Sequence, residues 1–231
     1  MYVKRYADVG IDITKEPFEV GCAPHTSLGG VEIAPTGATL VRGLFACGEA
    51  VGGLHGANRI GGNAGLETLV FGRRAGETAA AYLSGFADDY RLQDSVLEEW
   101  TEQTAFPNRP STEMVTVQEI RSRMEKALEQ DLNVARSRAG LRRGLEELDF
   151  LSDALPQQAM DPESAYEQLR LENDLYTARL AFTAALERKS SAGCHIREDA
   201  EPETQRYRVE LRRTPQGVSA EKKYLERDDG I

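Results

Sequence analysis

Residues 48–67 of the chain read GEAVGGLHGANRIGGNAGLE and place an acid, a histidine and an arginine among many glycines. Glycine has no Cβ, so the backbone of such a stretch can come close to a bound molecule and present its N–H groups to it. A helix is expected to follow the stretch, and the N-terminus of a helix attracts anions. The composition is typical of a ligand-binding loop between a strand and a helix.

The sequence around this loop predicts short strands before it and one long helix after it. Leu44–Cys47 is a short apolar run between glycines and predicts a buried strand. Gly29–Ile33 and Thr39–Leu40 predict two strands joined by a turn. Apolar residues at helical spacing predict a helix over residues 64–83. Residues 1–24 are expected to form an irregular lead-in.

Two flanking motifs identify a family resemblance. Together with HTSLGG at residues 25–30 and FGRRAG at residues 71–76, the loop resembles the C-terminal flavin-binding part of the fumarate reductase and succinate dehydrogenase flavoproteins, a family that includes L-aspartate oxidase. The resemblance implies FAD as the cofactor. The rest of the chain resembles the C-terminal helical domain of that family more loosely.

The family's N-terminal dinucleotide motif, GxGxxG, does not occur in the 231 residues. The segment that precedes His25 is also too short for a βαβ unit, which needs about 30 residues. We therefore expect an α/β FAD-binding half-domain, an incomplete Rossmann-like fold, followed by an α-helical bundle. The expected boundaries are residues 1–87 for the C-terminal part of the FAD-binding domain, 88–200 for a three-helix bundle and 201–231 for a tail with a short strand.

The resemblance assigns substrate binding to His25 and Arg59, which we take as the catalytic pair. A dicarboxylate needs cations and donors at its carboxylates, and the planar guanidinium of Arg59 can bind one carboxylate with two hydrogen bonds. His25 precedes a Gly-Gly pair and, by resemblance, donates a hydrogen bond to the substrate. The alternatives are an arginine paired with a structural acid and a histidine with a purely structural role.

Five further residues are expected to bind the cofactor. By resemblance Glu49 accepts hydrogen bonds from FAD hydroxyls, and the alternative is a solvated acid in a turn. His55 either orients the loop or contacts the flavin, and a structural role remains open for it. Asn63, Ala64 and Gly65 begin the predicted helix, where backbone N–H groups would stabilise negative charge on a reduced flavin.

A nearby C-terminal motif adds one expectation about packing. Residues 191–199 read SAGCHIRED and resemble the family's SRGAHxRxD, with Ala192 in place of the arginine. This difference puts any function of that arginine in doubt. We expect the segment to pack between the helical domain and the flavin domain.

Composition narrows the class of protein. The chain has 28 Lys and Arg against 38 Asp and Glu, a formal net charge of -10, which argues against nucleic-acid binding. Cys22, Cys47 and Cys194 lack the spacing of a disulfide framework or a zinc site, so we expect no metal. No segment has the length of a membrane span, and we expect a cytoplasmic protein whose membrane association, if any, is made through partner subunits.

These observations predict the C-terminal half or subunit of an FAD-dependent oxidoreductase that interconverts fumarate and succinate by hydride transfer through flavin N5. A partner polypeptide would supply the missing N-terminal FAD-binding and capping regions, and an iron–sulfur or haem subunit would exchange electrons. Two alternatives stay open: part of an L-aspartate oxidase or related dicarboxylate dehydrogenase, and a non-catalytic split or truncated interaction subunit.

Overall fold

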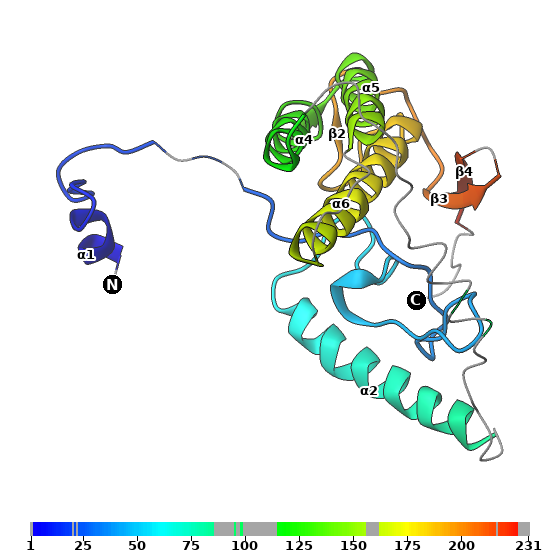
Figure 1. Cartoon of the computed structure of the whole chain (residues 1–231). Coiled ribbons are helices and arrows are strands. Elements are labelled where there is room, and N and C mark those ends of the chain that lie inside the picture. Colours follow the sequence, from blue (N-terminus) through cyan, green and yellow to red (C-terminus); the bar gives the residue numbers. More distant parts are fainter. Residues whose placement is uncertain are drawn as a thin grey trace. The chain divides into compact units, whose positions relative to one another are not determined.

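The computed structural model of the chain describes residues 2–19, 21, 23–85, 95, 98, 115–155, 162–215 and 217–225. The chain divides into two compact units, Met1–Gly85 and Phe86–Ile231, which are described separately below. Cys22 lies outside the described residues. Figure 1 gives the element labels.

The first unit contains three helical elements: α1 (Tyr2–Ala7), the short 3₁₀ helix η1 (Gly48–Ala50) and α2 (Asn63–Ser84). Helix α2 begins after Gly62, which has the left-handed φ of 88° that favours glycine, and it ends at Gly85. The predicted long helix is therefore confirmed. Helix α1 occurs where an irregular lead-in was expected, so that expectation was wrong over these residues.

The strands expected in the first unit are present only as isolated bridges. Val31 pairs with Val51 in parallel, Ile33 pairs with Thr39 and Ala38 pairs with Phe45. Leu44 is 50% exposed, so the segment expected to be a buried strand is not buried within this chain. A strand is buried only when neighbouring strands and helices cover it, and these extended segments pair only through isolated bridges among the described residues.

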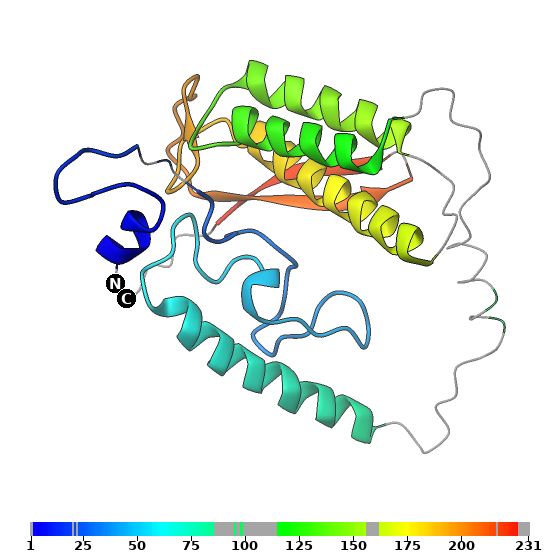
Figure 2. The same ribbon diagram turned by 60° about the vertical axis from the view of Figure 1, so that its left-hand side comes forward.

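Within residues 115–155 and 162–187, the second unit has three helices, α4 (Val117–Asp131), α5 (Arg138–Ala154) and α6 (Pro162–Glu187), which lie side by side in Figures 1 and 2. Polar caps define where two of them begin. The Thr116 hydroxyl accepts a hydrogen bond from the N–H of Glu119, and the Ser137 hydroxyl accepts one from the N–H of Gly140. The expected helical bundle is thus present in the part of the chain that the structure describes.

One continuous apolar core joins the three helices. Its members share near-complete burial and come from the facing stripes of α4, α5 and α6: Ile120, Met124, Leu141, Leu148, Leu151, Leu171, Leu175 and Phe182. Gly144 lets α5 approach α6, because a Cβ at this position would lie 2.2 Å from Cε1 of Phe182. The glycine is a packing requirement of the bundle.

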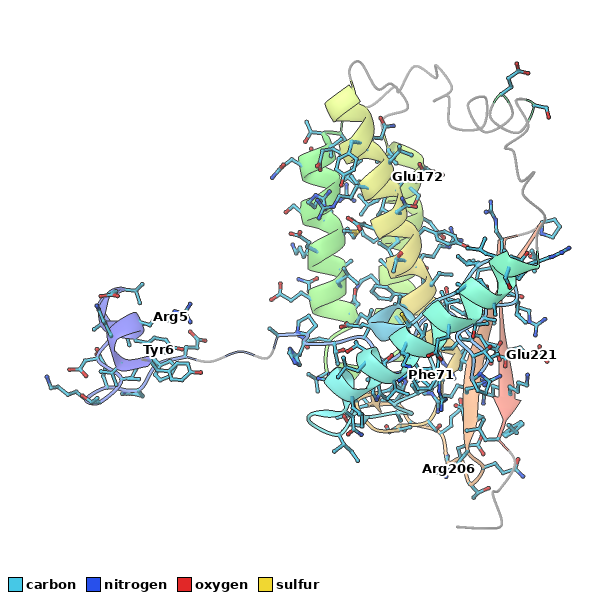
Figure 3. The ribbon with its side chains drawn as sticks, turned by 90° about the horizontal axis from the view of Figure 1, so that it is seen from below. Arg5, Tyr6, Phe71, Glu172, Arg206 and Glu221 are labelled. Carbon is cyan, nitrogen blue, oxygen red and sulfur yellow. The ribbon has the colours of Figure 1, made fainter. Side chains whose placement is uncertain are left out.

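Two small sheets complete the second unit. Strand β1 (Ala135–Arg136) pairs in parallel with β2 (Ile196–Arg197), and β3 (Tyr207–Thr214) forms an antiparallel hairpin with β4 (Gly217–Tyr224). The hairpin packs along α6, and Figure 3 labels Arg206 and Glu221 beside its two strands. Only β3 was expected from the sequence. The alternation of Val218 and Ala220 with polar residues also marks β4, although its charged end resembles a solvated tail.

None of the helices in the described residues is long and apolar enough to cross a bilayer.

Candidate functional site

Glycine contacts bring two distant segments of the first unit together. The N–H of Val31 donates to the carbonyl of Ala50 at 2.9 Å, and the N–H of Gly52 donates to the carbonyl of Val31 at 3.0 Å. A Cβ on Gly30 would lie 2.4 Å from the Ala50 oxygen. Only glycine therefore permits this approach, which places the segment that carries His25 beside the loop that carries Glu49.

Glu49 is the centre of a small polar group. Its Oε1 accepts a hydrogen bond of 2.8 Å from the backbone N–H of Ser27. That bond is the main cause of a lowered pKa for Glu49, with smaller contributions from the Thr26 hydroxyl and from the charges of Arg59 and His25. The same electrostatic interactions mean that the structure brings Glu49, Arg59 and His25 into one neighbourhood. Glu49 is an ionised acceptor at neutral pH.

The guanidinium of Arg59 supplies a positive charge near Glu49. Its side chain is partly buried, and among the residues that the structure describes no carboxylate lies within 4.0 Å of its guanidinium nitrogens. His25 is exposed. Both groups can therefore bind a carboxylate without breaking an existing ion pair.

The start of α2 supplies backbone donors. The first N–H groups of a helix have no partner within the helix. The residue that precedes α2 is Gly62, which offers no side-chain cap, and the first turn carries no acidic residue. Ala64 and Gly65 thus offer N–H groups that can bind an anion or a polarised carbonyl oxygen, whereas the N–H of Asn63 donates to the carbonyl of Ile60 at 3.2 Å.

A buried carboxylate that the sequence analysis missed connects the loop to α2. Glu67 is 8% exposed. Its Oε1 accepts a 3.0 Å hydrogen bond from the N–H of Gly48, and its Oε2 lies 3.5 Å from Nε2 of His55. The signal available in the sequence was an acid within the apolar run from Leu66 to Phe71.

A hollow of about 240 Å³ adjoins this carboxylate. Its walls are mostly apolar and come from the loop and from α2: Leu54, His55, Asn63, Leu66, Glu67, Val70 and Phe71. Phe71 is labelled on α2 in Figure 3. The hollow links His55 to Asn63, so two of the five residues expected to bind the cofactor share one depression.

The motif at residues 191–199 forms a polar cluster within the second unit. The fully buried side chain of Arg197 donates to the carbonyls of Ala185 and Arg188 at the end of α6 and to Asp199. His195 lies between Arg136 and the Arg188 carbonyl. The contacts described for this segment are made with α5, α6 and β1, and the expected role at the flavin domain remains a prediction.

Comparison with known proteins agrees with the sequence resemblance. Residues 2–64 match the FAD binding domain model, and residues 121–214 match the model described as fumarate reductase flavoprotein C-term. One component of the fumarate reductase (CoM/CoB) of Methanothermobacter marburgensis is 40% identical over 205 residues, which are 87% of this chain and 37% of that protein. L-aspartate oxidase of Streptomyces coelicolor is 34% identical over 82% of this chain and 33% of its own length.

Solved structures give the same result. A quinol–fumarate reductase with menaquinol molecules superposes with a TM-score of 0.84 and 26% identity, over 100% of this chain and 42% of that chain. The chain therefore spans less than half the length of the proteins it matches. FAD is the cofactor that these matches indicate. The chain belongs to the fumarate reductase and succinate dehydrogenase flavoprotein family, which includes L-aspartate oxidase, and it corresponds to the C-terminal part of these proteins.

Proposed function

We propose that the chain is the C-terminal half of an FAD-dependent oxidoreductase that interconverts fumarate and succinate. The observation that carries the proposal is the polar group at Glu49, whose carboxylate accepts the N–H of Ser27 at 2.8 Å and has Arg59 and His25 in its neighbourhood. A carboxylate acceptor, a guanidinium and an imidazole beside glycine-rich backbone are the groups needed to hold a flavin next to a dianionic substrate.

The residues present fit one part of FAD. At Gly30 and Gly52 a Cβ would meet the backbone of the opposite segment, so these glycines let the segment of His25 and the loop of Glu49 lie together, where both would contact the cofactor. Glu49 would accept hydrogen bonds from the hydroxyls of the cofactor. The N–H groups of Ala64 and Gly65 would face the flavin oxygen that becomes negative on reduction, with Asn63 beside them and the dipole of α2 behind them. When bound, FAD supplies hydride transfer at N5.

Arg59 and His25 have complementary roles toward the substrate. Arg59 would bind one carboxylate through two parallel N–H donors, which fixes the orientation of the molecule as well as its position. His25 would donate to the second carboxylate. Held at both ends, a C4 dicarboxylate keeps its central carbons at a fixed place, and this is the condition for efficient transfer of a hydride.

The exposed apolar surface of the first unit supports a partner region. Val51 and Ala75 are its buried hydrophobic residues, whereas Leu66 and Leu69 on α2 are 62% and 74% exposed. Surface of this kind marks a protein interface. We propose that residues 1–87 form the C-terminal part of an FAD-binding domain, which the N-terminal and capping regions typical of this family complete, and that residues 88–200 and 201–231 are the helical domain and its tail. An iron–sulfur or haem subunit would exchange electrons with the assembled cytoplasmic enzyme.

The test is co-expression with the polypeptide that carries GxGxxG and the capping region. The assembled wild type is expected to retain FAD and to reduce fumarate or oxidise succinate. Arg59→Ala should keep the flavin absorbance and lose turnover by about 100-fold or more, because it removes a charge-assisted pair with the substrate. Arg73→Ala is the matched control, since Arg73 is 79% exposed and pairs with Glu77 on the outside of α2. Normal turnover by Arg59→Ala would refute the substrate role.

The match to L-aspartate oxidase favours one second candidate. Aspartate carries the same two carboxylates, and Arg59 and His25 would bind it in the same way. Assays of the assembled protein with fumarate, succinate and aspartate separate the two activities, and turnover of aspartate alone would replace the leading proposal. An assembly that never binds FAD would favour the non-catalytic interaction subunit.

A further inference from the structure

Glu67 joins three parts of the first unit through a single buried side chain. One oxygen accepts the N–H of Gly48, which has a φ of 76° and directly precedes Glu49. The other oxygen faces Nε2 of His55 at 3.5 Å. The side chains of Glu67 and His55 are 7% and 17% exposed, so both contacts are largely shielded from water. The carboxylate therefore ties both ends of the Gly48–His55 segment to α2.

The position of Glu67 favours one place for the proton of a neutral His55, through a contact of 3.5 Å that is longer than a normal hydrogen bond. A carboxylate only accepts hydrogen bonds, so the ring nitrogen that faces it must carry the proton. Nε2 is that nitrogen. Nδ1 is then left with a lone pair, and among the described residues no hydrogen-bond donor is paired with it. A partly buried ring nitrogen without a donor is an acceptor that a ligand can satisfy.

We propose that Glu67 is a positioning residue that fixes the tautomer of His55, so that Nδ1 accepts a hydrogen bond from a hydroxyl or N–H donor of the flavin. This inference rests on the proposed function for its ligand and on the Glu67 contacts for its geometry. The pair itself is largely buried, because the side chains of His55 and Glu67 are 17% and 7% exposed. A low local dielectric strengthens the orienting effect of the carboxylate.

The substitution Glu67→Gln tests the orientation of the His55 ring separately from the anchoring of the loop at Gly48. The amide oxygen of the glutamine must accept from Gly48, because the N–H of Gly48 cannot face an NH₂ group. The NH₂ group is then directed at His55, where it donates to Nε2 and moves the ring proton to Nδ1. Glu67→Leu removes both contacts. Glu77→Gln is the matched control, because Glu77 lies on the same helix and its side chain is 62% exposed.

The first readout is nitrogen NMR of the full chain labelled with ¹⁵N-histidine at a pH where the imidazoles are neutral. The chain has three histidines, and the His55 signal is assigned by its absence in His55→Gln. Wild type and Glu77→Gln should show the Nε2–H tautomer, and Glu67→Gln should show the Nδ1–H tautomer. Amide exchange at Gly48 should stay slow in Glu67→Gln and become about tenfold faster or more in Glu67→Leu. An unchanged tautomer in Glu67→Gln would overturn the proposal.

The second readout is FAD binding by the chain assembled with its N-terminal polypeptide. Glu67→Gln should weaken FAD binding about tenfold, the effect of one lost hydrogen bond, and Glu77→Gln should not change it. A switched tautomer with unchanged FAD affinity would overturn the flavin contact of His55. If the wild-type assembly binds no FAD, the proposed function fails, while the tautomer measurement still decides whether Glu67 orients His55.

Discussion

Replacing Gly144 by alanine is expected to destabilise the helical bundle. A Cβ at this position would lie 2.2 Å from Cε1, 2.6 Å from Cζ and 3.0 Å from Cδ1 of Phe182. Phe182 is 0% exposed and packs in the common core of α4, α5 and α6. The ring therefore has no free space into which it can move, and α5 or α6 must shift.

Two opposing effects set the size of the expected change in the free energy of unfolding. Alanine is a better helix former than glycine by about 1 kcal/mol. Overpacking a core costs about 1–3 kcal/mol, and three ring atoms at or below 3.0 Å place this substitution at the upper end of that range. The expected net loss in the free energy of unfolding is about 2 kcal/mol.

Urea unfolding of the full chain, followed by far-UV circular dichroism, measures this loss. Glu146→Ala is the control, because Glu146 lies on the exposed face of the same helix, and its effect should stay within about 0.5 kcal/mol. Phe182→Leu should relieve the clash, so the double mutant should be more stable than the two single losses predict by about 1 kcal/mol or more. If Gly144→Ala instead stabilises the chain by about 1 kcal/mol, as an exposed helical glycine would, the close contact with Phe182 is refuted.

Three other predictions follow from the described contacts. Arg197→Met should lower the free energy of unfolding by about 3–5 kcal/mol, because it removes the buried donor of Asp199 and of the carbonyls at the end of α6. A urea midpoint equal to that of the exposed control Arg206→Met would refute this prediction. Burial lowers the pKa of His195 from 6.5 to about 4, so the unfolded chain binds the proton first and stability should fall as the pH decreases from 6.5 to about 4, then level off. His195→Gln should remove this dependence in unfolding curves measured across that range, and an unchanged pH profile would count against the assignment. Gly30→Ala should weaken FAD binding by the assembled protein about tenfold or more, because its Cβ would meet the Ala50 carbonyl, whereas Gly29→Ala, which has open space, should bind FAD normally.

Local periodicity predicted the parts of the fold that depend on one segment at a time. Helix α2 and the helices of the bundle carry their apolar stripes within their own sequence, and α4 and α5 also carry their N-terminal caps there. Strand β4 was missed because its last residues are charged, and these charges pair across the hairpin: Lys223 lies 3.1 Å from Glu210. A charged strand end is indistinguishable from a solvated tail until its partner strand is known.

Long-range contacts decided the features that periodicity could not predict. Glycine is a poor helix former, yet Gly144 is required in α5 because it leaves room for the ring of Phe182, which is 38 positions away in the sequence. The sequence alone does not distinguish Glu67 from an exposed charge on a helix. Its burial follows from Gly48 and His55, which meet it only after the loop has folded back on α2.

The family motif predicted the candidate site better than the chemistry of its individual residues did, because the site depends on long-range contacts. His25 comes from one segment, whereas Glu49 and Arg59 come from the loop at residues 48–67, and no spacing rule places the histidine beside the loop. They meet because the backbone at Gly30 lies against Ala50 and Gly52, at distances that no side chain would permit. The glycines of the motif therefore specify the assembly of the site, and the charged residues specify its chemistry. A substitution at Gly30 should consequently impair the site as severely as one at Arg59, although Gly30 has no side chain with which to bind a ligand.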